Sequence, residues 1–103
     1  MSTIQNIIKG EQPVLLDFYA TWCGPCKMQA PVLDEVKQQL GDRLRILKID
    51  VDKNPAFSMQ MSSQYPMRGV PTLMLFKQGK LLWIQSGFTN KQQLIAQLQQ
   101  HLG

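Results

Sequence analysis

Apolar positions recur along the chain with two different periods, and these periods predict its strands and helices. Residues 14–20 (VLLDFYA) and 43–51 (RLRILKIDV) are almost continuously apolar, as expected for strands that are covered on both faces. Helical periodicity precedes, separates and follows these two runs. It predicts helices over residues 2–10, over 24–40, from 55 onward and from 89 to the C-terminus.

Two further apolar runs, residues 72–76 (TLMLF) and 81–87 (LLWIQSG), flank the sequence KQGK, which is typical of a hairpin turn. A strand–helix–strand crossover produces a parallel strand pair, whereas a hairpin adds an antiparallel one. The sequence therefore predicts an α/β fold with a mixed central sheet and helices on both faces. No repeat, low-complexity segment or linker is visible, so we expect a single domain over residues 1–103.

Polar residues mark where three of the helices should begin. Ser2 with Gln5, and Thr89 with Gln92, fit the capping box. In this motif two side chains satisfy free backbone N–H groups at the start of a helix. Asn54 precedes a proline, and we expect it to cap the helix that follows.

Composition adds few constraints on function. Lysine and arginine total 11 against 7 acidic residues, which gives a net charge of +4, but the basic residues are scattered and form no run. We therefore expect a solvated surface with a mild preference for acidic partners rather than a nucleic-acid site. No leader peptide or membrane-spanning stretch is recognisable, which predicts a cytoplasmic protein without membrane contact. We also expect it to be a monomer.

The candidate chemistry is concentrated in the only two cysteines, Cys23 and Cys26, at the predicted start of a helix. At this spacing they can close a disulfide within one helical turn. Free N–H groups and the helix dipole favour a thiolate on Cys23, and Pro25 has no N–H group to lose in the first turn. We expect Cys23, at the exposed start, to attack a foreign disulfide. Cys26, one turn further in, would then resolve the mixed disulfide.

A metal site and a hydrolase fit the sequence less well. Two cysteines cannot supply an all-cysteine zinc site, so we expect no bound metal. The single histidine, His101, lies near the C-terminus, where we expect a surface residue beside the negative end of the last helix. It is no obvious base for a Cys–His hydrolase.

Asp17 is unusual because it is an acid within an otherwise apolar strand, where a charge is costly unless it is paired or used. The following helix should run back over the sheet and bring Cys26 toward Asp17. Burial would raise the pKa of Asp17, which could then accept the proton of Cys26, directly or through a water. Lys48, on the next strand, could face Asp17. The alternatives are a satisfied core acid and an ordinary strand-edge lysine.

The segment WCGPCK, with LLDFYA before it and RGVPT after it, resembles the thioredoxin family, and the resemblance extends over residues 14–102. It implies the thioredoxin fold and a protein-disulfide reductase. Such a protein reduces disulfides in client proteins, is recharged by thioredoxin reductase and carries no cofactor of its own. Gly24 and Pro25 suit a reductant, because relatives that oxidise or isomerise disulfides usually have a histidine between the cysteines.

The resemblance also implies roles for individual residues. Cys23 and Cys26 match the attacking and the resolving thiol. Asp17 matches the buried acid, and Lys48 matches its lysine neighbour. Pro71 matches the cis-proline that faces the disulfide. The client groove is expected to consist of Trp22, Gly69, Val70, Pro71, Gly87 and Phe88.

Three features depart from the family pattern. No strand precedes the first helix, so we expect the usual first edge strand to be missing and the sheet to have four strands. Tyr19 stands where the family usually has a second tryptophan. The segment over residues 56–67 is a few residues longer than usual and could alter client choice. Its methionines, Met59, Met61 and Met67, are expected to fill the core rather than to form a surface for partners.

Two other functions are left open by the sequence. One is an oxidase or isomerase, which a redox titration against glutathione would distinguish from a reductase. The other is a non-catalytic docking subunit that uses the surface of the thioredoxin fold. A docking function would survive replacement of both cysteines by serine, whereas a redox function would not.

Overall fold

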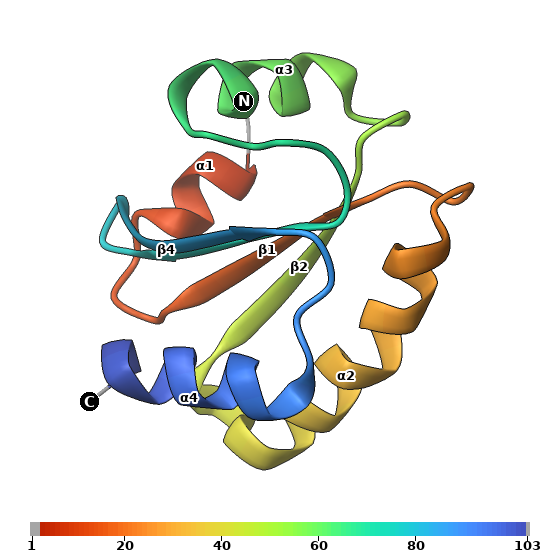
Figure 1. Ribbon diagram of the computed structural model, residues 1–103. Helices are drawn as coiled ribbons and strands as arrows, with labels where there is room; N and C mark the ends of the chain where they lie inside the picture. Colours follow the sequence, from red (N-terminus) through yellow and green to blue (C-terminus); the bar gives the residue numbers. More distant parts are fainter. Residues whose placement is uncertain (1–2, 103) are drawn as a thin grey trace.

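The computed structural model describes residues 3–102. Its four strands form one mixed sheet in the order β2-β1-β3-β4 (Figure 1). They are β1 (Val14–Tyr19), β2 (Arg45–Asp50), β3 (Thr72–Lys77) and β4 (Lys80–Ser86). β1 runs parallel to β2 and antiparallel to β3, and β3 pairs with β4 as a hairpin. Within the described residues no strand precedes β1. The predicted four-stranded sheet is therefore confirmed, and β2 forms one of its edges.

Helices cover both faces of this sheet, as the sequence predicted. They are α1 (Thr3–Ile8), α2 (Gly24–Leu40), α3 (Pro55–Gln64) and α4 (Lys91–Leu102). Figure 1 shows α1 and α3 on one face and α2 and α4 on the other. Each face has its own apolar cluster because side chains alternate along a strand. Leu15 packs with α2 and α4, whereas Leu16 packs toward α1 and α3. None of the helices found in residues 3–102 has the length and apolar character needed to cross a membrane.

The turns explain where the strands begin. β2 starts later than the sequence predicted, because Gly41–Arg43 form a turn of 3-10 helix before it. The predicted hairpin turn between β3 and β4 is confirmed. Gln78 (φ 53°) and Gly79 (φ 79°) both have positive φ, as in the two-residue turns that match the right-handed twist of a hairpin.

The cap of the last helix lies one residue from its predicted position. Asn90 caps α4, because its Oδ1 atom accepts a hydrogen bond from the Gln93 N–H group at 2.9 Å. The Thr89 hydroxyl group is buried and has no hydrogen-bond partner within the part of the chain that the structure describes. The predicted capping box of Thr89 and Gln92 is therefore wrong. Two adjacent residues could each cap this helix, and burial of Thr89 leaves the role to Asn90.

The start of α3 also differs from its prediction. Asn54 occupies the cap position, but its side chain donates to the Asp50 carbonyl oxygen at 3.0 Å and accepts no bond from the helix. Asp50 Oδ1 accepts from the N–H groups of Asp52 and Lys53, which closes the turn after β2. The remaining predicted cap involves Ser2, which lies outside the described residues.

The methionines of the segment over residues 56–67 divide between core and surface. Met61 is buried, and Met67 packs against the same apolar cluster, between the sheet and the layer of α1 and α3. Met59, on α3, has 72% of its surface exposed. The predicted core role is therefore confirmed for Met61 and Met67 and is wrong for Met59.

Candidate active site

Cys23 and Cys26 lie where the chain turns from β1 into α2. Cys23 is the N-cap residue of α2, with extended backbone angles (φ −94°, ψ 113°), and the two cysteines form a disulfide bond. The Cys26 N–H group donates to Cys23 Sγ at 3.2 Å. After reduction, this N–H group and the positive end of the helix dipole would stabilise a thiolate on Cys23. Pro25 stands in the first turn, where it removes no helical hydrogen bond.

Exposure does not distinguish the two cysteines, although the sequence suggested that Cys23 would be the exposed one. Each has 5% of its surface accessible. Their surroundings differ instead. Cys23 Sγ lies 3.6 Å from the carbonyl oxygen of Val70, whereas Cys26 lines a cavity that it shares with Asp17. A difference in reactivity between the two sulfurs must therefore come from their neighbours.

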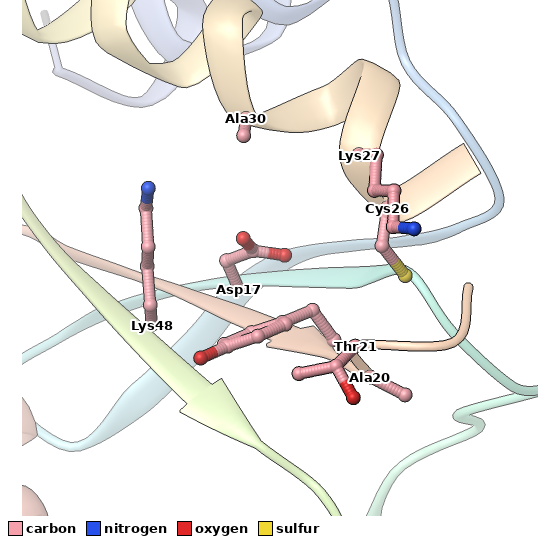
Figure 2. A pocket seen from close by; sticks show the side chains of 8 residues that line it. Asp17, Ala20, Thr21, Cys26, Lys27, Ala30 and Lys48 are labelled. Atoms are coloured by element: carbon pink, nitrogen blue, oxygen red, sulfur yellow. The ribbon is translucent and has the colours of Figure 1, made fainter. Parts of the chain in front are cut away.

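The cavity beside Cys26 has a volume of about 340 Å³. Figure 2 shows the Asp17 carboxylate between Cys26, at the start of α2, and the side chain of Lys48 on β2. The remaining lining residues are Tyr19, Ala20, Thr21, Lys27 and Ala30. A cavity of this size, with polar groups in its wall, has room for water. Proton transfer between Cys26 and Asp17 through a water, as the sequence suggested, is therefore sterically possible.

Asp17 is the group whose ionisation the fold perturbs. It is only 3% exposed, and within residues 3–102 its Oδ1 atom has no hydrogen-bond partner. Burial raises the pKa of Asp17 from 3.8 to about 6, and the positive charge of Lys48 lowers it in part. The two residues are paired in the register of β1 and β2, so the prediction that Lys48 lies beside Asp17 is confirmed. A carboxyl group with this pKa can both take and return a proton near neutral pH.

Two aromatic side chains of the predicted client groove are exposed. Trp22 has 69% and Phe88 has 39% of its surface exposed, so both offer apolar area to another molecule. The Trp22 Nε1–H group donates to Asp52 Oδ2 at 2.8 Å, which fixes the indole ring against the turn after β2. Sequence reasoning did not single out Asp52, because its contact with Trp22 spans 30 residues.

The backbone on the other side of the predicted groove is open. The Val70–Pro71 peptide bond is cis, as the resemblance implied. Gly69 (φ 131°) and Gly87 (φ 90°) have positive φ, and no atom lies within 4 Å of the place where a Cβ atom would stand on either residue. The Gly87 N–H group donates to the Pro71 carbonyl oxygen at 2.8 Å and so holds these two loops together. Another chain can approach this backbone closely.

Gln29 is a site-supporting residue that the sequence reasoning missed. Its side chain is fully buried on α2, in the same stripe as Leu33 and Val36. Its Nε2 atom donates to the Thr89 carbonyl oxygen, and its Oε1 atom accepts from the Thr89 N–H group, both at 2.9 Å. These two bonds fix the loop that carries Phe88 to the helix that carries Cys26. A polar residue within an apolar helical stripe was the available signal.

This arrangement allows a specific reaction. A thiolate on Cys23 can attack a disulfide presented at the aromatic surface, and Cys26, with Asp17 as its base, can then displace the product. Such chemistry defines the class of protein-disulfide oxidoreductases. Comparison with known families identifies the group within this class. The family model described as Thioredoxin matches residues 2–100, so the chain belongs to the thioredoxin family.

Individual relatives agree with this assignment. The chain is 47% identical over 97 residues to a thioredoxin of Acidithiobacillus ferridurans, covering 94% of this chain and 86% of the relative. It is 43% identical over 98 residues to thioredoxin 1 of a Nostoc species, covering 95% and 88% of the two chains.

Solved structures show the same fold. One, described as a malarial protein, is 32% identical with a TM-score of 0.81 and covers 89% of this chain and 99% of its own. Another is thioredoxin-2, described as a component of the malaria parasite protein secretion machinery. It is 31% identical, with a TM-score of 0.81 and coverage of 87% and 84%. The predicted thioredoxin fold is therefore confirmed.

Proposed function

We propose that this protein is a general protein-disulfide reductase that is recharged by thioredoxin reductase. The Cys23 thiolate attacks one sulfur of a client disulfide, and the other client sulfur leaves as a thiolate. Asp17 then accepts the proton of Cys26, whose thiolate attacks Cys23 Sγ and displaces the second client sulfur. The client gains the two electrons that the dithiol loses, and the Cys23–Cys26 disulfide is restored.

The observation that carries this proposal is the different environment of the two sulfurs. Cys23 lies at the helix start beside the Val70 carbonyl oxygen, and Cys26 faces the Asp17 cavity. A client segment in extended conformation would pair with the backbone at Val70, while Trp22 and Phe88 cover its apolar side chains. Backbone hydrogen bonds depend little on the side chains of the client, so we expect the protein to accept many client sequences.

The direction of electron flow and the location are further parts of the proposal. Gly24 and Pro25, between the cysteines, favour reduction of clients over oxidation. A dithiol reductant acts only where it is kept reduced, so we propose the cytoplasm as its compartment and a monomer as its working form.

The deciding experiment is insulin reduction by the purified protein, with NADPH and with or without a bacterial thioredoxin reductase. We expect sustained precipitation of insulin chains only when the reductase is present. A titration against glutathione gives the direction of electron flow: a strongly oxidising potential would show an oxidase or isomerase instead. A variant with both cysteines replaced by serine should lose all activity. Retention of a biological role by that variant would show a docking subunit.

A peptide complex tests the client groove. We expect the Cys26→Ser variant to form a stable mixed disulfide between Cys23 and a cysteine-containing peptide. In its crystal structure, the peptide should be extended and hydrogen-bonded to the backbone of Val70. A peptide that makes no backbone contact at Val70 would refute this part of the proposal and leave the redox chemistry untouched.

A further inference from the structure

The outer edge of β2 presents unpaired backbone groups. The Arg45 N–H group donates to the Pro13 carbonyl oxygen at 2.9 Å, so at Arg45 the backbone of β2 faces β1. Backbone direction alternates along a strand, and the N–H and C=O groups of Ile46 and Lys48 therefore point away from the sheet. Within residues 3–102, no turn, loop or side chain forms a hydrogen bond with these outward groups. They form a template on which another strand can pair.

A groove of about 330 Å³ lies beside this edge, between β2 and α2. Its wall is formed by Leu33, Asp34, Lys37, Arg45, Ile46 and Lys48. Leu33 and Ile46 supply apolar surface, and the ends of the charged side chains supply polar surface. An added strand would direct every second side chain into the groove, because side chains alternate between the two faces of a sheet.

The charges of this edge indicate the kind of strand that fits. Arg45 and Lys48 are exposed, and within residues 3–102 neither of them forms an ion pair. Lys37 holds its ammonium group against the carbonyl oxygens of Gly41 and Leu44, at 2.9 and 2.7 Å. Asp34 is the only acidic residue among those that line the groove. A segment with carboxylate side chains would complement these positive charges.

The same charges disfavour a second copy of this chain as the occupant. Two copies of β2 paired antiparallel about Lys48 would place the two lysines opposite each other, and directly opposed like charges destabilise a sheet. Lysine on an edge strand is a common protection against such self-association. The other edge, β4, is less suited to docking. Its register with β3 shifts between Leu75 and Phe76, whereas β2 pairs with β1 in unbroken register.

We propose that the outer edge of β2 is a docking site for an extended acidic segment of a partner protein, which adds a fifth strand to the sheet. Backbone hydrogen bonds to Ile46 and Lys48 supply the affinity, and carboxylates on the two faces of the added strand, one facing Arg45 and one facing Lys48, select the partner. The site is distinct from the client groove at Val70. It adjoins the active site, because Lys48 lines both the edge groove and the Asp17 cavity.

The test uses the full chain and a capped peptide of paired valines and paired glutamates, whose extended form carries carboxylates on both faces, with the matching valine–lysine peptide as control. The readout is the exchange of the Ile46 and Lys48 amide protons with water, followed by NMR. We expect the glutamate peptide to slow both exchange rates about tenfold when about nine-tenths of the chain is bound, and the lysine peptide to leave them unchanged. Failure of the glutamate peptide to slow them, or equal slowing by both peptides, would overturn the proposal.

Two matched variants place the binding on β2. Arg45→Glu should weaken binding of the glutamate peptide about tenfold, whereas Lys80→Glu, the same charge change on the β4 edge, should not change it. Both variants should reduce insulin at the wild-type rate, because neither residue contacts the active site. Equal weakening by both variants would show a non-specific charge effect and would overturn the proposal. Slowing of the two amides with rising protein concentration, without peptide, would show that a second copy occupies the edge.

Discussion

Cys23 and Cys26 are equally shielded from solvent, so any difference in their reactivity comes from the groups around each sulfur. Cys23 Sγ accepts the Cys26 N–H group at the positive end of α2, which favours a thiolate. Cys26 faces Asp17, which with a pKa of about 6 is mostly ionised at neutral pH. In the function proposed above, Asp17 is the base that accepts the proton of Cys26.

These environments predict opposite behaviour of the two cysteine variants. Cys23→Ser should abolish disulfide reduction, because the remaining thiol, Cys26, lines the Asp17 cavity and is not the sulfur beside the Val70 carbonyl oxygen. Cys26→Ser should still attack clients but should trap them as mixed disulfides, which non-reducing electrophoresis would display. In the reduced wild type, Cys23 should be alkylated faster than Cys26 at pH 7. Faster alkylation of Cys26 would reverse the assigned roles.

Asp17 makes the stability of the oxidised protein depend on pH. Its folded pKa of about 6 lies above the ordinary value of 3.8. Between these values the folded state binds more protons than the unfolded state, so the free energy of unfolding falls as pH rises through this window. This shift corresponds to roughly 3 kcal/mol of destabilisation above pH 6, as an upper bound.

The substitution Asp17→Asn should remove this penalty. We expect the oxidised variant to be more stable than the wild type by up to about 3 kcal/mol at pH 7.5, with almost no gain below pH 4, in urea unfolding. The exposed Asp34→Asn serves as the matched control and should change little at either pH. Resolution of mixed disulfides should also be slower in Asp17→Asn. Unchanged stability and unchanged turnover at pH 7.5 would leave Asp17 as a core acid without a role.

At the scale of elements, the active site depends on how α2 is fixed to the loop before α4. Gln29 makes this connection through two hydrogen bonds to the backbone of Thr89. Both groups of Thr89 lie in a buried environment, where a backbone group without a partner is costly. The Gln29 side chain therefore stabilises the fold and also fixes the backbone next to Phe88, a residue of the proposed client groove.

Replacing Gln29 by leucine tests this connection. Gln29→Leu leaves one donor and one acceptor of Thr89 unsatisfied, which should cost about 2–4 kcal/mol of unfolding free energy. Gln38→Leu, on the exposed face of the same helix, is the matched control and should cost little. We expect Gln29→Leu also to raise KM for insulin, because the loop with Phe88 is less well positioned. A loss of stability with an unchanged KM would show a purely structural role.

For the whole molecule, periodicity and connection rules were sufficient to predict the fold class. The apolar runs at residues 14–20 and 43–51 have few alternatives to buried strands, and the helix between them requires a parallel pair. The sequence KQGK could be recognised as a hairpin turn because it places Gly79, which adopts positive φ readily, between two apolar runs. These signals are local and strong. The elements that they predict therefore do not depend on contacts with distant residues.

Features that depend on contacts between distant residues could not be predicted in the same way. Asn90 and Thr89 both belong to residue types that cap helices, and the burial of Thr89 leaves this role to Asn90. The bond from Trp22 to Asp52 joins residues that no local pattern connects. Asp17 was predictable because a charge in a buried strand conflicts with its surroundings. Gln29 is likewise a polar residue among buried apolar ones, but this signal is weaker because glutamine is common on helices.

The exposed apolar residues predict where clients bind on the molecule as a whole. Trp22 directly precedes Cys23 and is exposed, whereas Met59 is exposed on α3, on the face of the sheet opposite α2 (Figure 1). If clients bind beside the disulfide, Trp22→Ala should raise KM for insulin about tenfold, because it removes a large apolar contact. Met59→Ala removes a similarly exposed side chain outside the groove and should leave KM unchanged.

The same pair of variants decides whether the segment over residues 56–67 recognises clients. Loss of a contact that is made equally in the ground state and in the transition state changes KM and not kcat, so the two constants should be measured separately. A higher KM in Trp22→Ala alone places recognition at the disulfide. A comparable rise in Met59→Ala would extend the client surface onto α3 and contradict the groove described above. Because Met59 has no role in the core, such a rise could not be explained by altered packing.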